Sequence, residues 1–129
     1  MISPHSILVV DDEQVLASLF KAFLKNQGYN VVSFTDPVGA FEYFKETAGL
    51  HSLIITDLRM PGIYGLDLAK KIRKINSNAK IFLMTAFDIG DLKESEDFIK
   101  TKIDRLLQKP VRFSDLRQMI NESLNMLNI

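Results

Sequence analysis

Residues 53–62 of the sequence read Leu-Ile-Ile-Thr-Asp-Leu-Arg-Met-Pro-Gly, an apolar run that ends in a carboxylate and is followed by a turn. Such a run predicts a strand covered on both faces, which is typical of parallel sheets with helices above and below. Pro61 has no N–H for a ladder and Gly62 permits a turn, so the strand cannot continue through them. Asp57 is therefore expected at the carboxyl end of a central strand, where open parallel sheets place their ligands.

The composition predicts one globular domain over residues 1–129, because 47% of the residues are hydrophobic and 25% are charged. Sixteen basic and sixteen acidic residues cancel, so the bulk charge favours neither nucleic acid nor an anionic membrane as a partner. The absence of cysteine excludes disulfides and thiolate metal sites. No leader-like amino end or apolar stretch approaching about 18 residues is present, and a cytoplasmic location is expected.

Short apolar runs alternate with segments of helical period along the whole chain. The runs predict five strands, at residues 7–10, 31–34, 53–57, 81–85 and 103–107. Apolar residues at helical spacing predict five helices, over residues 15–24, 37–44, 66–75, 91–102 and 116–127.

Several helix ends carry local signals. Gly28 can supply the left-handed residue that commonly ends a helix. Asp36 can cap a helix whose first position is Pro37, with Val38, Phe41 and Phe44 facing the sheet. Ser114 precedes the last helix.

The helix predicted over residues 91–102 is weakly anchored. It opens with Asp91 and Glu94 at capping-box spacing. Its candidates for burial are Leu92, Phe98 and Ile99.

Five strand-then-helix units imply an α/β fold in which a parallel sheet carries five helices on its two faces. The doubly wound, flavodoxin-like strand order 2-1-3-4-5 suits this pattern, with its switch point between the first and third strands. That order places Asp11 and Asp12, which follow the first strand, beside Asp57. Fold class alone does not give the function.

The chemistry comes from the residues that collect at the carboxyl edge of this sheet: Asp11, Asp12, Asp57, Thr85 and Lys109. Carboxylates packed closely repel one another, which is tolerable when a hard cation such as Mg²⁺ binds their oxygens. An ionised Asp is also a competent nucleophile toward a phosphoryl group, whose transfer needs mainly positioning and charge neutralisation. Mg²⁺, Lys109 and the Thr85 hydroxyl are the groups expected to neutralise that charge.

Along essentially its whole length, the chain resembles the receiver domains of the two-component response-regulator family, in their stand-alone, chemotaxis-regulator-like form. Each matching motif is weak alone, and their order and strand-end positions make them specific together. The motifs are Val-Val-Asp-Asp-Glu at 9–13, Asp-Leu-Arg-Met-Pro-Gly at 57–62, Met-Thr-Ala at 84–86 and Lys-Pro at 109–110.

The resemblance implies a phosphoacceptor. Asp57 would take a phosphoryl group from the phosphohistidine of a sensor histidine kinase or a phosphotransfer protein. Asp12, Asp57 and the backbone carbonyl of Arg59 would bind Mg²⁺, and Asp11 would assist. Self-phosphorylation, also from small phosphodonors, and slow autodephosphorylation would be the only catalytic activity.

The resemblance also implies roles for the other two strand ends. Lys109 would pair with the phosphoryl group, Thr85 would hydrogen-bond to it as the switch, and the bond between Lys109 and Pro110 would be cis, which is rare enough to be checked.

Two departures from the family pattern bear on signalling. Leu106 stands where many receivers have an aromatic ring that swings inward, and residues 100–104 lack the usual run of small residues. The change on phosphorylation is therefore expected in the loop and helix over residues 86–102. The resemblance is to a stand-alone receiver, in which no DNA-binding or catalytic domain would follow Ile129. We therefore expect signalling through a downstream protein partner, without direct DNA or membrane binding.

Other interpretations remain open. The chain could be a receiver-like interaction module that works without phosphate, or an aspartyl phosphatase or mutase, although such enzymes usually need a cap that this length does not provide. Singly, Asp11 and Asp12 could cap a helix, and Thr85, Lys109 and a trans Pro110 could be ordinary structural residues.

Three further groups of residues are expected to be structural. His5 and His51 are predicted to be surface loop residues, and four phenylalanines, Phe20, Phe23, Phe41 and Phe44, are predicted to be core. Five basic residues are expected mainly to form a solvated helix face, and docking or nucleic-acid binding is the less favoured interpretation. They are Lys70, Lys71, Arg73, Lys74 and Lys80.

Overall fold

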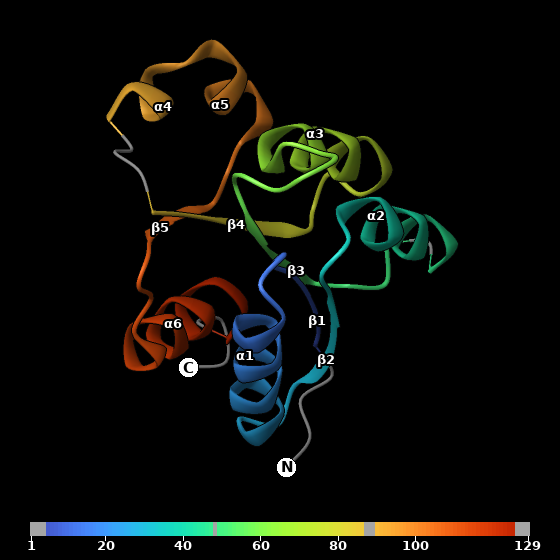
Figure 1. Cartoon of the computed structure of the whole chain (residues 1–129), viewed down its shortest axis with the longest axis vertical. Helices are drawn as coiled ribbons and strands as arrows, with labels where there is room; N and C mark the ends of the chain where they lie inside the picture. The colour runs from blue at the N-terminus through green and yellow to red at the C-terminus, as the bar shows by residue number, and fades with distance from the viewer. Residues whose placement is uncertain (1–4, 48, 87–89, 126–129) are drawn as a thin grey trace.

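A five-stranded parallel sheet lies between two layers of helices in the computed structural model, which describes residues 5–47, 49–86 and 90–125 (Figure 1). The strand order is β2-β1-β3-β4-β5, as the sequence predicts. The strands are β1 (Ser6–Val10), β2 (Asn30–Phe34), β3 (Leu53–Asp57), β4 (Lys80–Thr85) and β5 (Arg105–Gln108).

Helices cover both faces of the sheet. One layer holds α1 and α6, and the other holds α2 and α3, with α4 and α5 beyond α3 (Figure 1). Within the described ranges, no helix has the length and apolar character needed to span a bilayer. The helices are α1 (Gln14–Asn26), α2 (Pro37–Glu46), α3 (Gly65–Ile75), α4 (Gly90–Glu94), α5 (Glu96–Thr101) and α6 (Phe113–Ile120), followed by one π-helical turn, η1 (Asn121–Asn125).

The central strand β3 is buried along its whole length because both of its faces are covered. Ile55 packs into the cluster under α1 and α6, whereas its neighbour Ile54 packs into the cluster under α2 and α3. Burying such a side chain contributes about 1.5–3 kcal/mol relative to leaving it exposed. This two-sided burial fixes where β3 ends and therefore where Asp57 lies.

The predicted signals at two helix ends are confirmed. Gly28 has a left-handed φ of +96° just after α1. The Asp36 side chain accepts a hydrogen bond from the Val38 N–H at 3.1 Å, and Pro37 opens α2. Val38 itself is exposed, so the prediction that it faces the sheet is wrong.

Two boundaries differ from the prediction near the C-terminal end. α6 begins at Phe113, with Arg112 before it, so Ser114 lies inside the helix and does not precede it. The fifth strand covers Arg105–Gln108, two residues later than predicted at its start. Leu127, expected in the last helix, lies outside the described residues.

The single helix predicted over residues 91–102 is two short helices, α4 and α5, which is why the described residues form six α-helices where five were predicted. Ser95 separates them: its hydroxyl accepts from the Phe98 N–H at 3.1 Å and donates to the Leu92 carbonyl at 2.9 Å. A serine that caps a helix with its side chain competes with helix continuation through the same position. The expected capping box is wrong, because Asp91 lies within α4.

The helical spacing of apolar residues predicted burial at several positions that the structure leaves exposed. Phe20 and Phe44 are buried, and Phe23 and Phe41 are partly buried against the core, as predicted. The apolar side chains that the structure leaves exposed despite their helical spacing are Val15, Leu19, Ile75 and Ile99.

His51 is the opposite case. It was expected on the surface, yet it is only 1% exposed and packs against the rings of Tyr43 and Phe44. Its Nδ1 lies 3.0 Å from the Ser6 hydroxyl, and His5 is half-buried with Nδ1 3.0 Å from the Ser52 hydroxyl. The prediction of two surface histidines is therefore wrong.

Candidate functional site

Three carboxylates meet at the carboxyl edge of the sheet, as the strand order predicts. Asp57 ends β3, and Asp11 and Asp12 follow the neighbouring strand β1. One carboxylate oxygen from each residue lies within 4.8 Å of the other two. Asp11 and Asp57 are buried, whereas Asp12 is exposed and faces solvent at the mouth of the site.

Lys109 bridges the two buried carboxylates. Its Nζ lies 2.7 Å from Asp57 Oδ1 and 3.2 Å from Asp11 Oδ2. The Lys109 N–H donates to the Thr85 carbonyl at 2.8 Å, which fixes the end of β5 beside the end of β4. The peptide bond to Pro110 is cis, as the resemblance implies.

Backbone contacts hold the two aspartates in place. The Glu13 N–H donates to Asp11 Oδ1 at 2.9 Å, so Asp11 is fixed from both of its oxygens. Beyond Asp57, the N–H of Gly65 donates to the Leu58 carbonyl at 2.6 Å. A Cβ at Gly65 would lie 2.8 Å from Leu58 Cα and would overlap the Asp57 carbonyl oxygen, so this close approach requires glycine.

The electrostatics of the site are those of a crowded set of like charges. Burial raises the pKa of Asp57 to about 7; the hydrogen bond from Lys109 opposes this rise, and Asp11 adds to it. For Lys109, burial alone would lower the pKa, but Asp57 and Asp11 outweigh it and raise the pKa above its ordinary value. A further cation beside Asp57 would favour its charged form.

Thr85 and Arg59 border the same site. A cavity of about 190 Å³ opens over Asp57 and is lined by these two residues together with Asp12 and Lys109. Thr85 is buried at the end of β4, next to Met84, the residue in register with Asp57. All residues predicted for the site are therefore brought together at one sheet edge.

The donor set fits a magnesium ion. Carboxylate oxygens from Asp11, Asp12 and Asp57 are the hard ligands that Mg²⁺ prefers, and the exposure of Asp12 leaves room for the waters that Mg²⁺ keeps. Burial and the neighbouring Asp11 raise the pKa of Asp57, and a bound cation would oppose both effects.

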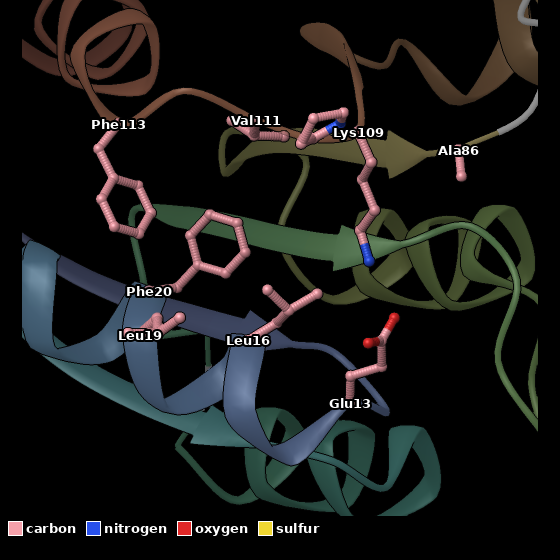
Figure 2. Close-up of a pocket in the computed structure, with 9 residues that line it drawn as sticks. Glu13, Leu16, Leu19, Phe20, Ala86, Lys109, Val111 and Phe113 are labelled. Carbon is pink, nitrogen blue, oxygen red and sulfur yellow. The ribbon is translucent and has the colours of Figure 1, made fainter.

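A second hollow, mainly apolar, adjoins the site and was not predicted from the sequence. Its volume is about 480 Å³, and Figure 2 shows Leu16, Leu19 and Phe20 of α1 facing Val111 and Phe113 across it. Lys109, which contacts Asp11 and Asp57, and Glu13 also line the hollow (Figure 2). The sequence carried no signal for it, because Leu19 has the helical spacing of a core residue and only the structure shows that it is 49% exposed.

Comparisons with known proteins agree with this geometry. The sequence model of the response regulator receiver domain matches residues 7–121. The chain is 32% identical over 121 residues to the response regulator receiver protein CpdR of Brucella abortus, covering 94% of both. It resembles the solved structure of the response regulator protein TrrA of Thermotoga maritima in complex with Mg²⁺-BeF, with a TM-score of 0.79, 33% identity, and coverage of 93% of this chain and 99% of that one.

Other relatives are much longer than this chain. It is 32% identical over 119 residues to the phosphoglycerate transport system transcriptional regulatory protein PgtA of Salmonella typhimurium. The matched region covers 92% of this chain and 28% of that protein. The chain thus spans less than a third of the length of the curated relatives that head the comparison.

Proposed function

Because the chain belongs to the response regulator receiver domain family, a signalling domain of two-component systems, we propose that Asp57 is its phosphoacceptor. The phosphoryl group would come from the phosphohistidine of a sensor histidine kinase or a phosphotransfer protein in a Mg²⁺-dependent reaction in the cytoplasm. The phosphorylated domain, residues 1–129, would then change its affinity for a downstream protein partner. The observation that carries this proposal is Asp57 itself, buried yet bordering an open cavity, with Lys109 Nζ at 2.7 Å.

Transfer would proceed by direct displacement. An oxygen of the Asp57 carboxylate forms a bond to phosphorus while the P–N bond to the imidazole breaks, and the electron pair stays on the imidazole nitrogen. A bound Mg²⁺, held by Asp12, Asp57 and the Arg59 carbonyl with help from Asp11, would neutralise charge on the phosphoryl oxygens. Such a reaction needs Asp57 ionised; its pKa is about 7 without the ion, and a Mg²⁺ beside it would lower that pKa.

Lys109 and Thr85 supply the remaining contacts. The Lys109 ammonium, already pointing at Asp57, would act as a point charge for a phosphoryl oxygen, while Asp11 keeps it aligned. The Thr85 hydroxyl, at the end of the adjacent strand, would donate to another oxygen and so report phosphorylation. Beyond self-phosphorylation and slow autodephosphorylation, we propose no catalytic activity.

The apolar hollow between α1 and the chain after Lys109 supports docking of the phosphodonor protein. It opens beside the acceptor, and Leu19 on its rim is half-exposed. An apolar side chain of the donor seated there would bring a neighbouring phosphohistidine to Asp57, because Lys109 borders both cavities.

The alternative is an interaction module that works without phosphate. It is the weaker proposal, because a module freed from phosphate would be expected to lose one of the groups that phosphoryl transfer needs. Here Asp57, Lys109 and the acidic ligands are all present and in contact.

The test is incubation with Mg²⁺ and acetyl phosphate, read by intact mass. We expect one added phosphoryl group in the wild-type chain, none in Asp57→Asn, and an undiminished addition in Glu42→Gln, whose exposed carboxylate on α2 pairs with Lys45. Labelling that persists at full rate in excess chelator would contradict the Mg²⁺ requirement. Labelling of Asp57→Asn would contradict the assignment of the acceptor.

A further inference from the structure

Arg73, in the last turn of α3, is not the solvated side chain that its place in a basic run predicts. Its side chain is only 15% exposed. Its guanidinium donates to the carbonyls of Thr101 at 3.0 Å and Lys102 at 2.8 Å, which end α5. It also donates to the carbonyls of Ser77 and Ala79, which lead into β4.

Asp104 completes this arrangement. Its Oδ2 accepts from Arg73 Nη2 at 3.0 Å and from the Ile81 N–H at 2.7 Å. The Asp104 N–H donates in turn to the Ile81 carbonyl at 2.9 Å. One planar guanidinium therefore joins the end of α3, the start of β4 and the chain that enters β5.

α5 is fastened in two more ways, one near its start and one at its end. Lys70 of α3 lies 2.8 Å from Asp97 Oδ2. Thr101 is buried and its hydroxyl donates to the Asp97 carbonyl at 2.6 Å, while Lys102 closes the helix in a left-handed conformation with φ +57°.

Among the described side chains of α4, the apolar contact with the core is made by Leu92. Leu92 packs, partly buried, against the small cluster of Leu58, Leu66 and Leu83. Ser95 breaks the helix between α4 and α5, so the two can change orientation without breaking a continuous helical ladder.

We propose that Arg73 is a positioning residue that fixes the far end of the segment following Thr85. This inference rests on the proposed function, in which phosphorylation of Asp57 is sensed at Thr85. The conformational change would begin at Ala86 and shift α4. The break between the helices at Ser95 would accommodate this shift, so that the chain at Lys102 keeps its position. The sequence-based expectation of a change over all of residues 86–102 is thereby narrowed to 86–95.

The strength and the geometry of the hydrogen bonds from Arg73 both support this role. Hydrogen bonds from an ionised group are roughly twice as strong as neutral ones, and a fork that binds several carbonyls is more rigid than a single contact. A segment with one strongly held end and one weakly held part deforms in the weakly held part.

The first test needs no phosphate. Amide hydrogen exchange is measured in the wild-type protein, in Arg73→Ala and in Lys74→Ala, a matched control that removes an exposed cation from the same turn of α3. We expect Arg73→Ala to accelerate exchange over residues 96–104 by about tenfold or more, with β3 unchanged. Lys74→Ala should not. Equal exchange over 96–104 in Arg73→Ala and wild type would overturn the proposal.

Two milder variants keep the test usable if Arg73→Ala does not fold. Arg73→Lys retains the charge but not the fork, and Asp104→Asn retains the shape but not the charge. Each should accelerate exchange over the same residues by a smaller factor than Arg73→Ala. Acceleration spread evenly over the whole chain would instead show a general loss of stability and would count against a positioning role.

The second test adds Mg²⁺ and beryllofluoride as a stable phosphoryl mimic. In the wild-type protein, exchange should change over residues 86–95 and stay constant over 96–108; in Arg73→Ala the change should extend into 96–108. A wild-type change that runs equally through 96–108 would overturn the proposal. If beryllofluoride changes nothing while Arg73→Ala still accelerates 96–104, the proposed function fails and the fixing role of Arg73 in the resting protein stands.

Discussion

Lys109 forms ion pairs with both buried carboxylates, those of Asp11 and Asp57. Lys109→Ala should lower the rate of phosphorylation by acetyl phosphate about a hundredfold, because a preorganised charge at the reacting group is lost. The free energy of unfolding should fall by only about 1–2 kcal/mol. The reason is that Asp57, with its pKa of about 7, can accept a proton in place of the lost ion pair.

Intact-mass time courses and urea unfolding measure the two effects, with Lys25→Ala on the exposed side of α1 as the control. A variant that accepts phosphate at the wild-type rate would show that Lys109 has no part in the transfer.

The burial of His51 should make the free energy of unfolding depend on pH. Burial lowers its pKa from 6.5, and its Nε2 is buried without a hydrogen-bond partner among the residues that the structure describes. The unfolded chain therefore binds a proton first as the pH falls below 6.5, and the free energy of unfolding should decrease with acidification. Above that pH both states are neutral at His51, and no dependence is expected from it.

Asp57 has the opposite sign in the same range, because its raised pKa makes the folded state bind the proton first. Denaturant unfolding should therefore be compared between pH 7.5 and 5.5 in the Asp57→Asn background. There the chain with His51 should lose more stability than the chain with His51→Phe. Parallel pH profiles with and without His51 would refute the assignment.

At the level of the helices and strands, Gly65 tests whether the start of α3 positions Asp57. Gly65→Ala should destabilise the fold by about 1–3 kcal/mol, because the new Cβ overlaps the backbone that follows Asp57. It should also slow phosphorylation, since that backbone must shift.

Gly39→Ala is the matched control. It lies inside α2, where a Cβ would meet Asp36 Oδ2 at 3.4 Å, and the helical gain of about 0.5–1 kcal/mol should leave it neutral or stabilising. Urea unfolding and intact mass measure both variants. Equal effects of the two substitutions would mean that the close approach at Gly65 is not special.

Local patterns predicted the elements wherever a short-range cause decides them. The strands are continuous apolar runs. Asp36 and Pro37 mark the start of α2, because the Asp36 side chain accepts a hydrogen bond from a backbone N–H of the first turn, as the sequence suggests. The division at Ser95 was missed because Asp91 and Glu94 offered an equally good start, and only contacts with α3 decide between them.

Burial of polar residues could not be predicted for a similar reason. Arg73 and His51 look like surface residues in any local window, and their partners lie between 4 and 45 residues away along the chain. The site itself was predictable, because strand order alone brings Asp11, Asp12 and Asp57 to one edge.

For the molecule as a whole, Mg²⁺ should act as a folding ligand. An ion that binds only the folded state stabilises it by about 1.4 kcal/mol at ten times its dissociation constant. Thermal unfolding should therefore shift upward with Mg²⁺ concentration in the wild type, and much less in Asp12→Asn. Since few protein groups hold the ion, we expect the shift to need millimolar concentrations, on the order of weak Mg²⁺ sites. A melting temperature independent of Mg²⁺ would contradict this.

The way the sheet ends has a consequence for solubility. In the described part of the chain, β2 and β5 form its two edges. Exposed edges invite pairing with strands of other molecules, and short strands with charged side chains discourage it. β5 has only four residues, of which Arg105 is exposed and bonded to Glu122 at 2.9 Å. A charged side chain held across the outer strand makes edge-to-edge aggregation unfavourable, so a β-branched substitution such as Arg105→Val would remove that protection while leaving the phosphoacceptor edge intact.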